Sequence, residues 1–119
     1  MRRLIFLVAL GTMIPAGCAL ASDEEEAPEP KPEFTEAYLN DEKAQALGME
    51  LWADQCRHCH GAKAYPGKAP KLKPRKYKPG FVFRRITKGF RKMPGWRDVY
   101  SFEERKALVA YIKSRKFSP

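Results

Sequence analysis

The 119-residue sequence predicts an all-α protein with one small domain, and three observations support this prediction. Apolar residues recur at three- and four-residue spacing in residues 44–52 and again in residues 107–112, which is the period of a helix. No segment shows the sustained alternation of apolar and polar residues that a half-buried strand requires. Between the two periodic segments, residues 61–80 carry four prolines and three glycines, a composition typical of an irregular loop.

The N-terminus resembles a secretory signal peptide over residues 1–21, because two arginines precede an apolar run at residues 4–14. Two processing sites are open. The tripeptide Ala-Leu-Ala at residues 19–21 matches a small-x-small cleavage site. Residues 15–18 instead resemble the box of a bacterial lipoprotein, in which Cys18 becomes the lipidated first residue. Either outcome places the protein in the periplasm or another extracytoplasmic compartment, and the second also tethers it to a membrane.

Charge is unevenly distributed along the chain. Residues 22–40 are rich in Glu and Pro, carry a net charge of −6, and are predicted to form an extended, disordered linker. Residues 41–119 hold twenty Lys or Arg and seven acidic residues, a net charge of +13. Such an excess of positive charge attracts an acidic partner, either a protein, an anionic membrane or nucleic acid. Export argues against nucleic acid.

The first long helix is expected to begin at Asn40 or Asp41, both suitable N-caps, and to run directly into Cys56. Gly48 lies in the middle of this helix, where glycine costs about 1 kcal/mol relative to alanine. A packing reason, such as close approach by another helix, is therefore expected there. The predicted inward face comprises Ala44, Leu47, Gly48, Leu51, Trp52 and Gln55.

The second half of the chain predicts two further helices. Residues 81–88 form a short helix that Gly89 ends. Ser101 and Glu104 make a capping box, so the last helix begins after Ser101 and runs to about residues 113–115. Its predicted apolar face comprises Ala107, Leu108, Tyr111 and Ile112.

The stretch Cys56-Arg57-His58-Cys59-His60 carries the chemistry. Two thiols three residues apart on a helical turn can each bond to a vinyl group of haem, and His60 is then held against the iron. A haem in the middle also explains how 79 residues without a disulfide framework acquire a core. It gives the long loop a ligand around which to wrap.

Methionine is the usual second ligand of an electron-carrying haem, and Met93 is the candidate by elimination. Met1 and Met13 belong to the signal. Met49 lies on the helix that carries the cysteines, seven residues before Cys56, and cannot easily reach the opposite haem face.

Residues 41–117 resemble a class I c-type cytochrome domain of the small, mono-haem bacterial kind. The matching positions are Gly48, Trp52 and Cys56 at four-residue intervals, Leu108 and Tyr111 in the last helix, Gly89 to Pro94 around the distal methionine, and Pro70 with Leu72 after the haem motif. The resemblance implies the small cytochrome c fold, with terminal helices crossing at Gly48 around one covalently attached haem c. It also implies that the Pro70 carbonyl accepts a hydrogen bond from His60 and orients the ring.

These features predict an electron carrier rather than an enzyme: a monomer that passes single electrons between exported or membrane redox partners. The basic loop Lys68–Lys78 departs from the family pattern and indicates an acidic partner, such as an oxidase or a dehydrogenase. A small haem enzyme or sensor, peroxidase-like or gas-binding with a labile sixth ligand, stays open as the alternative. A redox dithiol lacks its strand–helix–strand framework here, and one helical turn cannot supply the four ligands of a zinc site.

Overall fold

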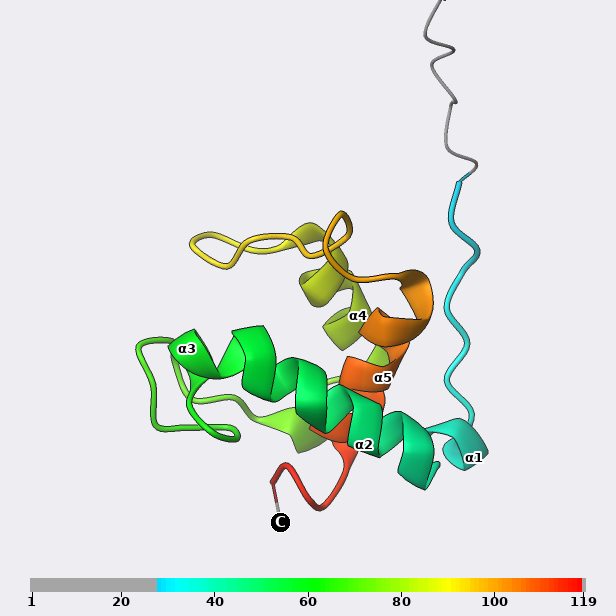
Figure 1. Cartoon of the computed structure of the whole chain (residues 1–119), viewed down its shortest axis with the longest axis horizontal. Helices are drawn as coiled ribbons and strands as arrows, with labels where there is room; N and C mark the ends of the chain where they lie inside the picture. The colour runs from blue at the N-terminus through cyan, green and yellow to red at the C-terminus, as the bar shows by residue number, and fades with distance from the viewer. Residues whose placement is uncertain (1–27, 119) are drawn as a thin grey trace, which may run out of the picture.

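The computed structural model describes residues 28–118, which form helices and loops without a β-strand (Figure 1). The elements are α1 (Glu36–Leu39), α2 (Glu42–Leu51), the π-helical turn η1 (Trp52–Cys56), α3 (Arg57–His60), the 3₁₀ turn η2 (Pro74–Lys76), α4 (Pro79–Lys88) and α5 (Phe102–Lys113). The all-α prediction is confirmed. The predicted signal peptide and Cys18 lie outside the described residues.

The first long helix begins where the sequence indicated. Asp41 is its N-cap, and the Asp41 carboxylate accepts a hydrogen bond from the backbone N–H of Ala44 at 2.7 Å. The helix does not stop at the cysteines, because α2, η1 and α3 follow one another without a break as far as His60. Leu47 was expected on the inward face but is exposed. Gln45 is buried instead, and its side-chain amide donates to the Leu39 carbonyl.

Helices α2 and α5 cross at Gly48, as the resemblance implied. A Cβ atom at Gly48 would lie 2.8 Å from Cβ of Tyr111 and 2.7 Å from the carbonyl carbon of Ala107. Both distances are shorter than van der Waals contact, so only glycine lets the two backbones approach this closely. The cost of a mid-helix glycine is thus offset by the packing that its missing side chain permits.

The last helix supplies more of the core than any other element. Its capping box is formed as predicted: the Glu104 N–H donates to Ser101 Oγ, and the Glu104 carboxylate accepts from the Ser101 N–H. The buried residues of α5 include Leu108 and Tyr111, with Val82, Phe83 and Ile86 of α4 packed in the same core. Phe117, beyond the end of α5, completes this core. Its ring packs edge-on against Trp52, with the centroids 4.6 Å apart.

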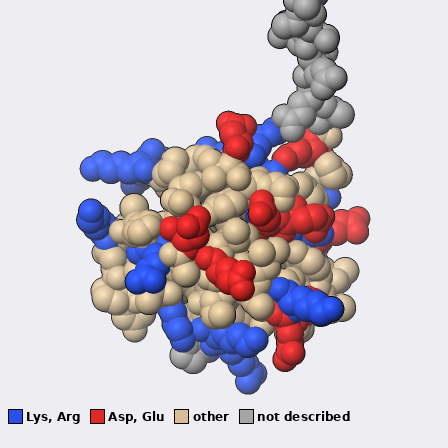
Figure 2. Space-filling view, viewed as in Figure 1, with Lys and Arg blue, Asp and Glu red and all other residues tan. Residues whose placement is uncertain are grey.

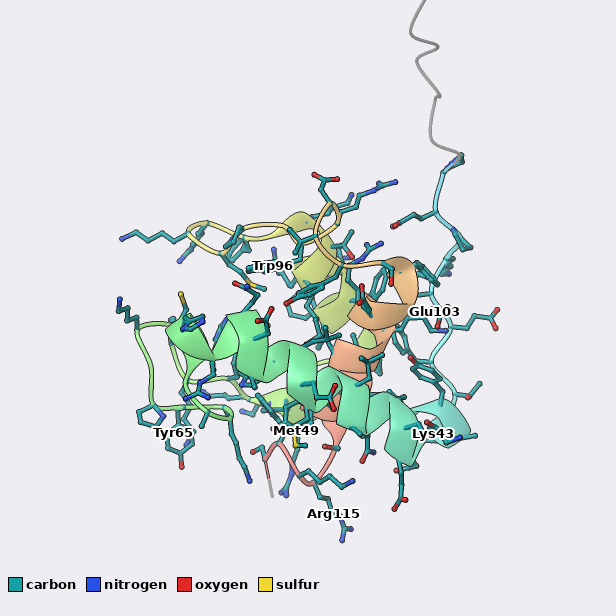
Figure 3. All side chains as sticks on the ribbon, in the orientation of Figure 1. Lys43, Met49, Tyr65, Trp96, Glu103 and Arg115 are labelled. Carbon is teal, nitrogen blue, oxygen red and sulfur yellow. The ribbon has the colours of Figure 1, made fainter. Side chains whose placement is uncertain are left out.

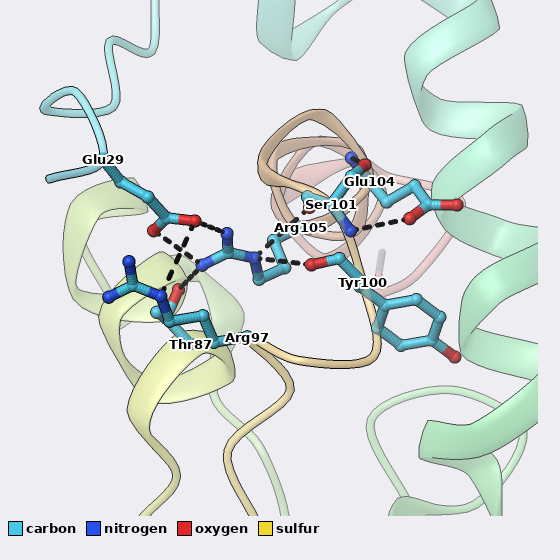
Figure 4. Close-up of polar contacts among 7 residues, drawn as sticks. All are labelled: Glu29, Thr87, Arg97, Tyr100, Ser101, Glu104 and Arg105. Atoms are coloured by element: carbon cyan, nitrogen blue, oxygen red, sulfur yellow. Dashed lines mark hydrogen bonds and ion pairs between the residues drawn. The ribbon is translucent and has the colours of Figure 1, made fainter. Parts of the chain in front are cut away.

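The segment before α2 differs from the extended linker that composition predicted. Residues 36–39 form helix α1, capped by the Thr35 hydroxyl, and Phe34 packs against Phe83 with ring centroids 6.0 Å apart. Glu29 forms an ion pair with Arg105 of α5 (Figure 4). The linker prediction is therefore corrected for residues 28–40, since contacts with α4 and α5 override their polar composition.

Candidate functional site

Both cysteines of the Cys-x-x-Cys-His stretch are free thiols at one end of the long helix. Cys56 is the last residue of the π-helical turn η1 and is half-buried, whereas Cys59 lies in α3 and is exposed. Burial raises the pKa of the Cys56 thiol to about 12, so this thiol is protonated at neutral pH. Isolated π-helical turns are rare and occur frequently at functional sites.

His60 is held by the indole of Trp52. The two ring centroids lie 5.5 Å apart, and Trp52 Nε1 donates to the carbonyl of Gly61 at 3.1 Å. The Nδ1 atom of His60 is buried without a hydrogen-bond partner among the described residues. Desolvation lowers the pKa of His60, which favours the neutral imidazole that a metal can bind.

The hydrogen bond expected between His60 and the Pro70 carbonyl is not formed in this structure, because His60 Nδ1 has no partner. Pro70 itself is exposed. Two backbone bonds hold the loop around it: the Ala69 N–H donates to the carbonyl of Cys59 at 2.8 Å, and the Leu72 N–H donates to the carbonyl of Ala64 at 3.2 Å. The loop therefore returns to the haem motif without reaching the ring nitrogen.

Met93 lies in a tight turn that follows α4. The N–H and carbonyl groups of Phe90 and Met93 pair in both directions, at 2.9 and 3.0 Å, so Arg91 and Lys92 form a two-residue loop. Arg91 has a φ of 55°. Met93 is half-buried and packs against the core. Figure 1 shows this loop (yellow) reaching the same side of the molecule as α3.

The donor groups at this end fit a c-type haem. Two free thiols can form thioethers, a neutral imidazole and a thioether sulfur suit haem iron, and the unpartnered Nδ1 is a buried polar atom without a function in the protein alone. Residues 28–118 bring together no group of three or more His, Cys, Asp or Glu side chains able to hold a metal ion.

Sequence reasoning passed over one residue close to the thiols. Tyr100, buried just before α5, points its hydroxyl at Asp54 Oδ2, 3.4 Å away, and stacks on Trp96 with ring centroids 5.7 Å apart. Burial, with the nearby Cys56 and Asp54 charges, raises the pKa of Tyr100 to about 12. In the sequence, only the aromatic side chain of Tyr100 indicates that this residue could lie in the core. His58 is exposed.

Charged side chains separate on the surface. Figure 2 shows acidic side chains over the middle and right of one face and basic side chains mainly along its left and lower edges. The six cations of the basic loop Lys68–Lys78 are all exposed. No helix within residues 28–118 has the length and apolar character needed to cross a membrane.

The crossing of α2 and α5, with a Cys-x-x-Cys-His motif at the end of the first helix, defines the class of c-type cytochrome domains. A family model described as "Cytochrome C oxidase, cbb3-type, subunit III" matches residues 43–112, which is more than half of the chain. The chain belongs to this family of cytochrome c domains, which implies haem binding and electron transfer. Domains of this family are typically extracytoplasmic. No curated protein matches the chain.

Proposed function

We propose that this protein is a mono-haem c-type cytochrome that carries single electrons between exported or membrane-bound redox partners. The observation that carries the proposal is the half-buried His60, which follows two free thiols on one helical end and whose Nδ1 lacks a protein partner. The family match over residues 43–112 supports the same conclusion. No substrate turnover is expected.

Each residue at this end has a distinct proposed role. Cys56 and Cys59 would hold haem through two thioether bonds, and His60 and Met93 would bind its iron. Trp52 fixes the chain beside His60 through its hydrogen bond to Gly61, so the imidazole starts from a restricted position. When bound, haem supplies a reversible one-electron iron couple, whose potential a thioether ligand raises. The surrounding core keeps water away from it.

The expected partner is an acidic protein, such as an oxidase or a dehydrogenase, and the exposed cations of loop Lys68–Lys78 would attract it. Association rates should then fall as ionic strength rises, because salt screens charges over about 8 Å at physiological concentration. The protein acts as a monomer in this proposal. Nucleic acid is not an expected partner.

A lipid anchor at Cys18 would hold the domain close to the membrane. The composition of residues 22–40 suggested a long tether, but Glu29 is already paired with Arg105 on the domain. Eleven residues separate Cys18 from Glu29, and a fully extended chain of that length would reach about 34 Å at ~3.1 Å per residue. Cleavage after Ala21 would leave the protein free in the periplasm instead.

Mass spectrometry of the protein purified from the exported fraction tests the proposal. We expect the mass of the processed chain plus one haem, with neither Cys56 nor Cys59 open to alkylation. The same measurement identifies the N-terminal residue and any acyl chains, and so decides between the two processing sites. Colourless protein with both thiols alkylated would contradict the proposal.

The alternative of a small haem enzyme or gas sensor has one structural observation in its favour. Met93 lies two residues after Arg91, whose φ is 55°, and is only half-buried, which suits a ligand that can leave. Rapid binding of carbon monoxide to the reduced protein, or turnover of peroxide, would favour this alternative. Slow or absent binding would favour the electron carrier.

A further inference from the structure

A surface pocket of about 530 Å³ lies between η2 and the end of α5, formed by segments of the chain on either side of α4. Three of its lining residues are cations and none is acidic. Figure 3 shows one of the cations, Arg115, projecting from the chain just after α5. The lining residues are Pro74, Arg75, Lys113, Ser114, Arg115 and Ser118.

Lys113 is the pocket residue whose side chain is fixed by hydrogen bonds to the backbone. Its Nζ donates to the carbonyl of Pro74 at 2.7 Å and to the carbonyl of Tyr77 at 2.6 Å, so the ammonium group is held in place by the backbone of the loop. An ammonium group has three N–H donors, and these two bonds leave one unused. Lys113 forms no ion pair among the described residues. Burial lowers the pKa of Lys113, and the charge of Glu36 opposes this shift from beyond ion-pair distance.

Two guanidinium groups complete the donor set. Arg75 and Arg115 are exposed, form no ion pair among residues 28–118, and approach the pocket from the loop and from the segment after α5. A guanidinium presents a planar fork of N–H donors that matches a phosphate group. The Ser118 hydroxyl is a further donor on the rim.

The charge of the pocket selects among anions. Three cations around one small volume exceed the single negative charge of a carboxylate, whereas a phosphate group carries close to two charges at neutral pH when singly esterified or free. We infer that the pocket formed by Arg75, Lys113 and Arg115 binds a phosphate-bearing anion, through two guanidinium forks and the remaining N–H of Lys113. This site is separate from the haem-binding residues and does not depend on the proposed electron transfer.

Inorganic phosphate is the probe, titrated into the isotopically labelled, purified protein at an ionic strength held constant with sodium chloride. We expect saturable amide shifts at Arg75, Ser114 and Arg115, and the R75Q/R115Q variant should bind at least about tenfold more weakly. R75K/R115K keeps the charge but removes the forks, so its loss should be intermediate. Both arginines are exposed, so a fold check by circular dichroism should show unchanged helix content.

The matched control is K31Q/K43Q, which removes two charges from exposed lysines without an ion pair or side-chain hydrogen bond among the described residues. Phosphate affinity in this control should stay within about twofold, the range of a general electrostatic change. Equal weakening in both variants, or no saturable shift in the unaltered protein, would overturn the inference.

Vesicles distinguish the source of the phosphate. Sedimentation with phosphatidylcholine vesicles that contain phosphatidic acid, whose headgroup is a singly esterified phosphate, compared with phosphatidylcholine alone, tests a lipid headgroup. Binding to the anionic vesicles that R75Q/R115Q loses and K31Q/K43Q retains would assign the site to a headgroup. Phosphate binding without vesicle binding would assign it to a free phosphate compound. Absence of both would refute the site.

Discussion

Two buried polar groups at opposite ends of the core differ in how completely the protein satisfies them. Arg105 is 1% exposed, and its guanidinium donates to the carbonyls of Tyr100 and Ser101, to the Thr87 hydroxyl and to both carboxylate oxygens of Glu29 (Figure 4). His60 Nδ1 is also buried, but it has no partner among the described residues.

In the Arg105 region, protein atoms supply the hydrogen bonds that the buried polar group needs. In the His60 region, they do not. Buried polar groups in folded proteins nearly always find a hydrogen-bond partner, and the exceptions require an explanation. Around Arg105, residues from three parts of the chain supply every bond. Around His60, the helix end, the free thiols and the loop leave an acceptor or a ligand missing. The His60 end is therefore where a bound group, the proposed haem, would complete the site.

The largest effect should follow from removing both thiols. In C56A/C59A, haem is no longer captured, the His60 region stays incomplete, and most of the chain should fail to fold at physiological temperature. Thermal unfolding followed by circular dichroism measures this. A compact, stable apo-domain would show that the Arg105 region and the α2–α5 crossing are enough to fold the chain without haem. It would also remove the contrast between the Arg105 and His60 regions.

Replacing Met93 with alanine should leave the haem attached and lower its reduction potential, on the order of 0.1 V or more, because axial ligands are a main determinant of haem potentials. Potentiometric titration measures the change. M49A is the matched control, since Met49 is 47% exposed on α2 and its loss should leave the potential unchanged. An unchanged midpoint in M93A would mean that another group is the ligand.

Breaking the Arg105 network should cost about 1.5–3 kcal/mol, because E29Q leaves a buried guanidinium with a weaker partner. Chemical denaturation measures this cost. E33Q is the control, since Glu33 lies on the same segment but is exposed and has no ion pair among residues 28–118. Equal stability of E29Q and E33Q would show that the segment before α2 does not contribute to the fold.

The same pair has a characteristic pH dependence. The hydrogen bond from Arg105 is the main cause that lowers the pKa of Glu29 below its usual value of 4.5. The stabilisation from the Glu29–Arg105 ion pair is therefore fully present above the usual pKa of Glu. It is lost as pH falls through the lower pKa that Glu29 has in the folded state. The difference in unfolding free energy between the unaltered protein and E29Q should shrink over this acidic range, and a constant difference would argue against the ion pair.

The smallest expected effect concerns the turn that presents Met93. Arg91 has a φ of 55°, a conformation that costs a residue with a side chain about 1–2 kcal/mol. R91G should relieve this strain and gain up to about 1 kcal/mol after the entropy cost of glycine in the unfolded chain. K92G, at the neighbouring position without positive φ, should instead lose stability. The denaturation midpoints of both variants test whether the positive φ of Arg91 costs stability.

Local patterns predicted the helices well because their signals lie within a few residues. Asp41 and the Ser101–Glu104 capping box satisfy the first N–H groups of their helices, and Gly89 ends α4 in a conformation that favours glycine. Leu47 and Gln45 show the limit of such patterns. Both residues lie in the regular helix α2, where Leu47 is exposed and the Gln45 side chain donates to the Leu39 carbonyl, a contact that periodicity cannot reveal.

The sequence alone determined the class of the protein, because the chemistry of Cys56, Cys59 and His60 depends on their spacing within a single helical turn. It also determined the Gly48 crossing, since a mid-helix glycine needs a packing reason. Only the tertiary structure decided that residues 28–40 contact α4 and α5 and that Phe117 closes the core. These outcomes depend on contacts between residues far apart in the chain, such as Glu29 with Arg105, whose distances no local pattern encodes.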